Sequence, residues 1–233
     1  MRLIIALAMP AATLSIAVSF DLVCPWCLIG KRNLEAALQQ LRSEQPGLAV
    51  AVEWRSLPLI PGTPLEGVPY RAFYVARLGS PEAVAIRQGQ VRAAAEQAGL
   101  ALALDRIQHF PNTLLAHRLV RLARQDHGAD AAAGLVEDLF TRYFLQGQDI
   151  GDPLVLRDAL RACRIALPQP LEGPLHHGLP WLPPLADVEG SGTGVPHFAF
   201  DGSFAVSGAQ PPSVLLRGMR RALAQRALLL QEA

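Results

Sequence analysis

Cysteine is scarce in this chain of 233 residues, and the sequence has little aromatic character and almost no excess of charge. Three cysteines are too few for the disulfide framework of a small secreted domain. Lys and Arg (21) nearly balance Asp and Glu (20), so we expect neither a nucleic-acid partner nor an acidic tail. The length allows one large hydrophobic core, or one core with an insertion. The cysteines are therefore the first candidates for functional residues.

Long apolar runs are also rare, and the one near the start, from Leu3 to Phe20, does not predict a membrane span. It is only about as long as the shortest spans. Pro10 interrupts it, and its last third has the alternation of a strand. A single Arg2 and the lack of a small-residue cleavage site argue against a signal peptide. Met9 as the natural start is a further hypothesis. We expect a cytoplasmic protein without a membrane partner, and periplasmic export is the less favoured alternative.

The feature that stands out is Cys24-Pro25-Trp26-Cys27. The run from Leu14 to Phe20 before it predicts a half-buried strand. Apolar residues at helical spacing follow it, so the motif lies at a strand-to-helix turn with Pro25 near the first helical position.

Two thiols at this place predict a redox site. The thiolate is the nucleophile in disulfide exchange, and the unpaired N–H groups and dipole of a helix N-terminus favour a negative charge on Cys24. Cys27, one turn further along, is placed to resolve a mixed disulfide. Trp26 is neutral and bulky, and we interpret it as a hydrophobic lip for substrate.

Zinc is the main structural alternative for such a pair, but a zinc site needs four ligands. The chain has no second CxxC, and only Cys163 and the pair His176 and His177 remain as suggestive ligands. That histidine pair lies in a Pro- and Gly-rich stretch typical of a solvated loop. Cys163 ends a helical pattern, where a lone cysteine is most often a small buried hydrophobe. We therefore assign no metal site.

The rest of the chain predicts one α/β domain formed from both ends. A second alternating run from Leu48 to Trp54 follows the first helix and completes a βαβ unit. Val195 to Phe200 and Ser203 to Val206 predict a hairpin around Asp201-Gly202, and a closing amphipathic helix begins at Pro211-Pro212.

The middle of the chain predicts helices, apart from a weak strand signal at residues 100–104. Ser80-Pro81 and Asp152-Pro153 each combine an N-cap with proline at the first helical position. The expected helices are Arg71 to Leu78, Pro81 to Ala98, Thr113 to Asp126, Ala129 to Gln146, and Pro153 to Cys163.

These pieces together resemble the DsbA-like family of thioredoxin-fold proteins, and in particular its FrnE-like branch of dithiol-disulfide oxidoreductases. The resemblance extends from about Leu14 to Leu228. It rests on these segments in this order: Cys24-Pro25-Trp26-Cys27 with Ile29-Gly30-Lys31-Arg32; Pro64 and Gly67; Asn112-Thr113 with Ala116-His117-Arg118; Leu139-Phe140, Tyr143-Phe144 and Asp149-Ile150; Gly194-Val195-Pro196; and Ala205-Val206-Ser207-Gly208-Ala209-Gln210.

The resemblance implies a thioredoxin-like α/β fold, with a large all-helical insertion between its βαβ half and its ββα half. The expected thioredoxin-like domain comprises residues 14–60 and 176–233, and the insertion comprises residues 61–175. The resemblance also implies a cis Val195-Pro196 bond within contact distance of Cys24, with Val195 offering its backbone to an extended substrate.

The resemblance adds two candidate residues, and one segment of this chain departs from the family pattern. Asn112 and His117 are candidates for lining the cleft above Cys24. The plainer and favoured interpretation is that Asn112 caps a helix and that His117 is a hydrogen-bonded packing residue. The departure is the segment of residues 168–184, which contains more proline than a helix allows.

The leading function is therefore that of a thiol-disulfide oxidoreductase, with Cys24 as nucleophile and Cys27 as resolving thiol. Its substrates would be peptide or small-molecule thiols and disulfides. We expect no cofactor, with glutathione as the one candidate co-substrate. The protein would be a monomer or a homodimer. The alternative is a glutathione-dependent enzyme similar to 2-hydroxychromene-2-carboxylate isomerases or kappa-class transferases, whose members tend to have serine in place of Cys24. A non-enzymatic thiol-binding module is a third class. The direction of electron flow stays open.

Overall fold

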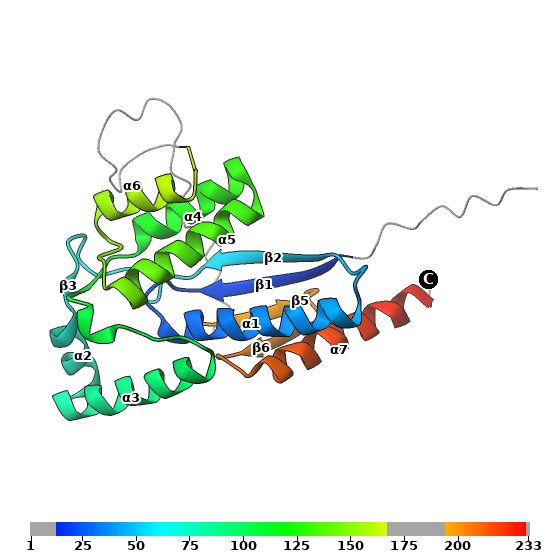
Figure 1. Ribbon diagram of the computed structural model, residues 1–233, viewed down its shortest axis with the longest axis horizontal. Helices are drawn as coiled ribbons and strands as arrows, with labels where there is room; N and C mark the ends of the chain where they lie inside the picture. The colour runs from blue at the N-terminus through cyan, green and yellow to red at the C-terminus, as the bar shows by residue number, and fades with distance from the viewer. Residues whose placement is uncertain (1–12, 167–193, 232–233) are drawn as a thin grey trace, which may run out of the picture.

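A four-stranded sheet is the centre of the molecule in the computed structural model, which describes residues 13–166 and 194–231. Its strands are β1 (Leu14–Phe20), β2 (Val50–Ser56), β5 (His197–Phe200) and β6 (Phe204–Ser207), in the order β2-β1-β5-β6. β1 is parallel to β2 and antiparallel to β5, and β6 is antiparallel to β5. The two ends of the chain thus form one sheet, as Figure 1 shows, and the predicted α/β thioredoxin-like fold is confirmed.

Helices α1 (Pro25–Glu44) and α7 (Pro212–Gln231) pack side by side against this sheet (Figure 1). Two glycines allow the close approach. A Cβ on Gly30 of α1 would lie 3.0 Å from the ring of Phe198, and a Cβ on Gly218 of α7 would lie 2.7 Å from the ring of Phe200. The aromatic residues of β5 therefore fill the space directly under both helices.

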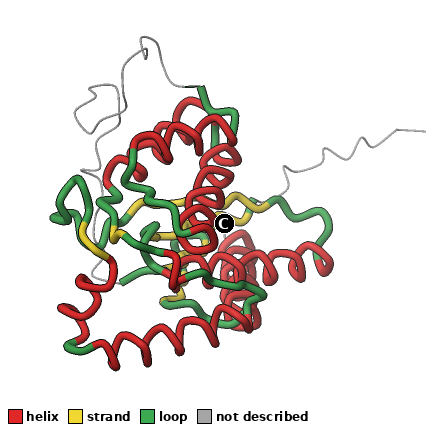
Figure 2. The backbone as a smooth tube through the Cα atoms, turned by 60° about the vertical axis from the view of Figure 1, so that its left-hand side comes forward, coloured by secondary structure: helices red, strands yellow, loops and turns green. Residues whose placement is uncertain are grey.

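The helices of the middle segment form two groups. The first is α2 (Tyr70–Leu78) and α3 (Pro81–Gln97), a hairpin at the end of the molecule where α1 begins, and α3 contacts α1 (Figures 1 and 2). The second is α4 (Leu114–His127), α5 (Ala129–Phe140) and α6 (Pro153–Ala162), and its members α4 and α5 contact β2. The expected helix starts at Pro81 and Pro153 are both found. The Ser80 hydroxyl accepts from the N–H of Ala83 and the Asp152 carboxylate from that of Leu154.

Three local predictions for this segment differ from the structure. A two-stranded sheet of β3 (Val68–Pro69) and β4 (His109–Phe110) interrupts the segment expected to be all helical. The weak strand signal at residues 100–104 is wrong, because the chain there leads into a 3₁₀ turn, η1 (Leu104–Arg106). The helix expected to reach Gln146 changes to a π-helical turn, η2 (Thr141–Gln146). Two-residue strands and single turns are too short for periodicity to reveal.

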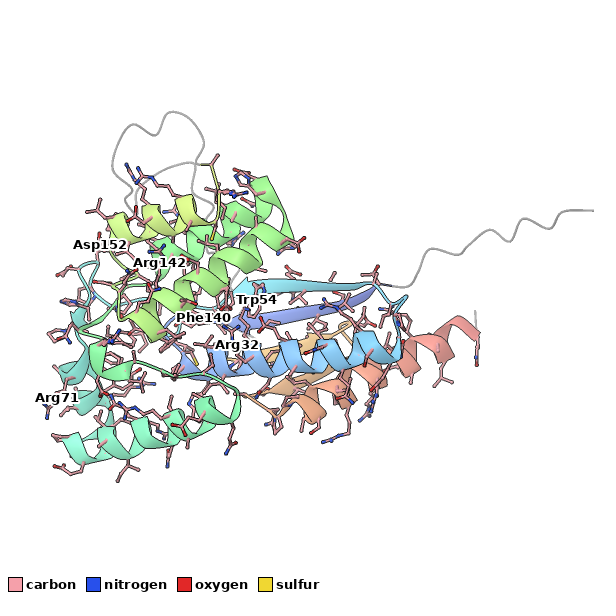
Figure 3. The ribbon with its side chains drawn as sticks, in the orientation of Figure 1. Arg32, Trp54, Arg71, Phe140, Arg142 and Asp152 are labelled. Atoms are coloured by element: carbon pink, nitrogen blue, oxygen red, sulfur yellow. The ribbon has the colours of Figure 1, made fainter. Side chains whose placement is uncertain are left out.

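Side chains from α1, β2 and α5 meet in the core beside the sheet. Figure 3 shows Arg32, Trp54 and Phe140 together at this junction. The Phe20 ring of β1 contacts Trp54 at 5.3 Å and Phe140 at 6.1 Å between centroids, and all three residues are buried. These contacts attach the helical segment to the sheet directly beside the first turn of α1.

Several predictions fall on residues outside the described ranges. They concern the start at Met1 or Met9, the path of the Pro-rich segment 168–184, and the pair His176 and His177. The boundaries of a separate insertion domain also stay a prediction. Within residues 13–166 and 194–231, no helix has the length and apolar character of a membrane span.

Candidate active site

The CxxC motif forms the start of α1. Cys24 is the N-cap residue, with extended backbone angles, and Pro25 and Trp26 are the first two helical residues. The N–H of Cys27 donates to the carbonyl oxygen of Cys24 at 2.9 Å, and the N–H of Cys24 donates to that of Asp21 at 3.1 Å. No acidic residue lies in the first turn, so nothing in that turn opposes a thiolate at the positive end of the helix dipole.

The two cysteines are free thiols in different surroundings. Cys24 is 7 % exposed and lines a pocket, whereas Cys27 is 1 % exposed and faces the core. Burial raises the pKa of Cys27 well above its ordinary value, and the hydrogen bond and charge of Cys24 raise it further, as does the charge of Asp21. A backbone hydrogen bond from Asp21 opposes these effects only in part. Cys27 is therefore held as a neutral thiol while Cys24 meets the pocket.

Val195 and Pro196 lie against the motif from the other end of the chain. The peptide bond between them is cis, and the Cys24 thiol donates to the Val195 carbonyl oxygen at 3.9 Å. Pro196 is buried close to Gly30, where an added Cβ would lie 3.1 Å from its ring. The strand β5 starts immediately afterwards, so the sheet fixes the position of this loop relative to Cys24.

A pocket of about 290 Å³ lies beside Cys24 on the side of the α2–α3 hairpin. Pro25 and Trp26 contribute to its wall. Its remaining walls come mostly from aromatic and aliphatic side chains of α2, α3, β4 and the loop after β2. The aromatic ones are Tyr70, Phe73, Tyr74 and Phe110. Cys24 is thus the only cysteine of the described chain that this pocket reaches.

Asn112 and His117 lie in the interior and do not line this pocket. The Asn112 side chain accepts from the N–H of Leu114 at 3.0 Å, at the start of α4, and donates to the carbonyl oxygen of Thr63 at 2.5 Å. His117 is completely buried next to Phe20, with 5.2 Å between ring centroids. Both side chains therefore connect the helical segment to the loop after β2 and to the core.

His117 has a partner that its sequence position alone did not reveal, which is Asp21. Nε2 of His117 lies 3.0 Å from Oδ1 of Asp21, and both side chains are completely buried. Asp21 also accepts from the N–H of Leu59 at 2.7 Å and from the Thr113 hydroxyl at 3.3 Å. An acidic residue within the apolar stretch directly before the motif was the available signal, because a buried carboxylate needs such partners.

Charged residues further along α1 form a second connection to the helical segment. Lys31 and Arg32 both pair with Glu137 of α5, Lys31 at 2.6 Å, and both also pair with Glu35 of α1. The Lys31 side chain is buried and its ammonium lies 5.9 Å from the centre of the Trp54 ring. This network holds α1 and α5 together without contacting either cysteine.

Within residues 13–166 and 194–231, no three His, Cys, Asp or Glu side chains are grouped closely enough to hold a metal ion. Cys163 is half-buried at the end of α6, far along the chain from the motif. Burial raises its pKa, so the thiolate is disfavoured there.

The family is shown by comparison with known proteins. A model of the DSBA-like thioredoxin domain matches residues 15–172, and the chain belongs to this family of thiol oxidoreductases. No curated protein matches the sequence. Among solved structures, the fold is similar to that of a probable DsbA oxidoreductase from Streptomyces coelicolor, at 24% identity and a TM-score of 0.73 over 91% of this chain and 90% of the other. It is also similar to a 2-hydroxychromene-2-carboxylate isomerase, at 13% identity and a TM-score of 0.50 over 92% and 98%.

Proposed function

We propose that this protein is a dithiol-disulfide oxidoreductase of the FrnE-like branch, with Cys24 as the nucleophile and Cys27 as the resolving thiol. The observation that carries the proposal is the difference between the two thiols. Cys24 occupies the N-cap of α1 at the edge of a pocket, whereas Cys27 is buried and its pKa is raised. One thiol is thus available for attack while the other stays protonated until a mixed disulfide has formed.

The exchange proceeds in two balanced steps. The Cys24 thiolate attacks one sulfur of a substrate disulfide, the substrate S–S bond breaks, and the other substrate sulfur leaves as a thiolate that takes up a proton. Cys27 then loses its proton and displaces the remaining substrate sulfur from Cys24. The products are a Cys24–Cys27 disulfide and two substrate thiols, so two electrons pass from protein to substrate. The same steps in reverse oxidise a substrate dithiol.

The backbone at Val195 supports the binding of an extended substrate beside Cys24. Its carbonyl oxygen lies within reach of the Cys24 sulfur, and an extended segment added there would pair with it by strand addition. Peptide and small-molecule disulfides are both proposed as substrates, and no metal or organic cofactor is needed for the chemistry. The chain has three cysteines, two of them in one motif, and this usage fits a cytoplasmic protein that employs its thiols in catalysis.

The test measures reduction of a disulfide and oxidation of a dithiol by the wild type and by three single variants. Cys24→Ser should abolish both reactions. Cys27→Ser should stop after the first step and accumulate a mixed disulfide, seen as added mass on the protein. Cys163→Ser is the matched control and should keep full activity. A titration of the reduction potential of the Cys24–Cys27 pair then gives the favoured direction of electron flow.

Two other outcomes would replace the proposal. Activity that survives in Cys27→Ser and depends on glutathione would indicate an isomerase or transferase reaction. If the wild type neither reduces disulfides nor oxidises dithiols, the fold acts as a thiol-binding module instead.

A further inference from the structure

The charged side chains that line the pocket beside Cys24 are all positive. Two arginines line it, Arg77 near the end of α2 and Arg87 in α3, and no Asp or Glu is among its lining residues. Both arginines are exposed, and neither has an ion-pair partner among the residues the structure describes. The two unpaired cations therefore lie where a ligand would meet them.

The rest of the pocket is suited to an apolar ring. Phe73 stacks on Phe110 with 3.7 Å between centroids, and Tyr74 packs edge-on against Phe73 at 5.1 Å. Trp26 and Tyr70 also line the pocket and bring its aromatic side chains to five. Stacked and edge-on contacts of this kind favour a planar guest. The volume of about 290 Å³ is at the lower end for ligand pockets, which suits a small molecule and not a folded protein segment.

Arg77 and Cys24 both influence the pKa of Tyr74, which forms part of the pocket wall. Burial raises the pKa of Tyr74. The charges of Tyr70 and Cys24 raise this pKa further, and the charge of Arg77 lowers it. Tyr74, Arg77 and Cys24 all line the pocket, so a ligand bound in it meets an aromatic wall, a guanidinium and the nucleophilic sulfur.

From these contacts we infer that the pocket selects small disulfides whose half next to the attacked sulfur combines an aromatic ring with a carboxylate. This inference rests on the proposed function and names its substrate class. The ring would lie against Trp26 and the stacked pair of Phe73 and Phe110, and the carboxylate would reach Arg77 and Arg87, which offer the bidentate donors that carboxylates prefer.

The reaction in the pocket is the exchange described above, with an aryl disulfide as the oxidant. The Cys24 thiolate attacks the sulfur bonded to the ring nearest to it, and one aryl thiolate leaves. Cys27 then displaces the second aryl thiolate and gives up its proton. One reduced protein and one diaryl disulfide yield one oxidised protein and two aryl thiols, so atoms and electrons balance.

The test compares three disulfides with the reduced full-length protein. Dithiobis(nitrobenzoate) has a ring and a carboxylate, dithiodipyridine has a ring without negative charge, and dithiodiglycolate has carboxylates without a ring. Each rate constant is divided by the rate constant of free dithiothreitol with the same disulfide. This ratio corrects for differences in intrinsic reactivity among the three disulfides. The wild type should favour dithiobis(nitrobenzoate) over both others on this scale.

The variants that test the role of the two pocket arginines are Arg77→Gln and Arg87→Gln, and Arg71→Gln is the matched control. Arg71 is an exposed arginine on the outer side of α2 (Figure 3) and does not line the pocket. Each pocket substitution should lower the relative rate with dithiobis(nitrobenzoate) about fivefold, and the double variant about twentyfold, as expected for exposed ion pairs. Rates with dithiodipyridine should change less than about twofold, and Arg71→Gln should change neither. Added salt should slow only the anionic disulfides.

The outcomes separate this inference from the proposed function. If the wild type oxidises its dithiol with these disulfides but the double variant keeps the wild-type preference, or Arg71→Gln has the same effect, the inference is overturned and the function stands. If dithiodiglycolate equals dithiobis(nitrobenzoate), the aromatic walls have no role in selection and the inference also fails. If no Cys24–Cys27 disulfide forms with any of the three, the proposed function itself fails.

Discussion

Nε2 of His117 lies 3.0 Å from Oδ1 of Asp21, and no part of either side chain is exposed. The Asp21 carboxylate also holds the N–H of Leu59 and the hydroxyl of Thr113. One buried group thus joins the end of β1, the loop after β2 and the start of α4. Three segments that meet at the CxxC motif depend on it, because a buried carboxylate is stable only while these partners are present.

Removal of this charge should destabilise the fold. Asp21→Asn keeps the size of the side chain but replaces a charged acceptor of hydrogen bonds with a neutral amide. We expect a loss of about 3 kcal/mol in the free energy of unfolding, measured by urea denaturation. Asp152→Asn is the control, because asparagine caps a helix as well as aspartate and should change the free energy by a few tenths of a kcal/mol. Equal effects of the two substitutions would contradict the role assigned to Asp21.

The raised pKa of Cys27 predicts a loss of stability of the reduced protein in alkali. The thiol keeps its proton in the folded state above pH 9.0, its ordinary pKa, while the unfolded chain releases it. The folded state then binds more protons, so the free energy of unfolding falls as pH rises, by about 1.4 kcal/mol per pH unit for one group. Urea denaturation of the reduced wild type and of Cys27→Ser between about pH 8 and about pH 10 measures the difference.

Tyrosines that titrate in the same range act equally in both proteins, so only the difference between the two curves reports on Cys27. Parallel curves would mean that the Cys27 thiol is not held protonated by its surroundings.

The network around Glu137 predicts the opposite behaviour in acid. Burial raises the pKa of Glu137, but hydrogen bonds from Arg32 and Lys31 outweigh it and lower the pKa to about 2. A carboxyl whose folded pKa is lowered stabilises the fold above its ordinary value of 4.5 and loses this effect as pH falls towards about 2. The wild type should therefore lose stability over this range more steeply than Glu137→Gln.

The same variant tests the network at neutral pH. Glu137→Gln leaves the buried ammonium of Lys31 with Glu35 as its remaining carboxylate, and we expect a loss of about 1–2 kcal/mol in the free energy of unfolding. Glu66→Gln, at an exposed position without an ion-pair partner in the described chain, should leave the free energy of unfolding at neutral pH unchanged. A Glu137→Gln protein with wild-type acid stability would show that the network contributes nothing.

Local chemistry explains which parts of this structure the sequence predicts. Ser80-Pro81 and Asp152-Pro153 define helix starts, because the hydroxyl or carboxylate accepts from a backbone N–H of the first turn and proline has no N–H that needs a partner. Both predicted helix starts, Pro81 and Pro153, therefore agree with the structure to the residue. The position of Cys24 at the start of α1 follows from Pro25 in the same way. These features depend only on neighbours in the chain.

Features that depend on distant neighbours escape this kind of prediction. Whether Asp21 is buried depends on His117, which is 96 residues away, and on a helix that returns to the end of β1. The pocket depends on α2 and α3 lying beside Trp26, and no periodicity in either helix specifies which element it packs against. His117 itself looks the same in sequence whether it lines a cleft or a core. Only the path of the whole chain decides between these.

The last prediction concerns the close approach of α1 to the loop before β5. Gly30 has no Cβ, and one placed there would lie 3.0 Å from Phe198 and 3.1 Å from Pro196, both of which are buried. Gly30→Ala should therefore push these residues away, lower the free energy of unfolding by about 1–3 kcal/mol and slow disulfide exchange, because Val195 moves relative to Cys24. Gly134→Ala in α5 is the matched control, since a Cβ there meets nothing within 4 Å. That substitution should stabilise the protein by up to about 1 kcal/mol through helix propensity alone. If Gly30→Ala is as well tolerated as Gly134→Ala, the contact between α1 and Pro196 does not hold the site together.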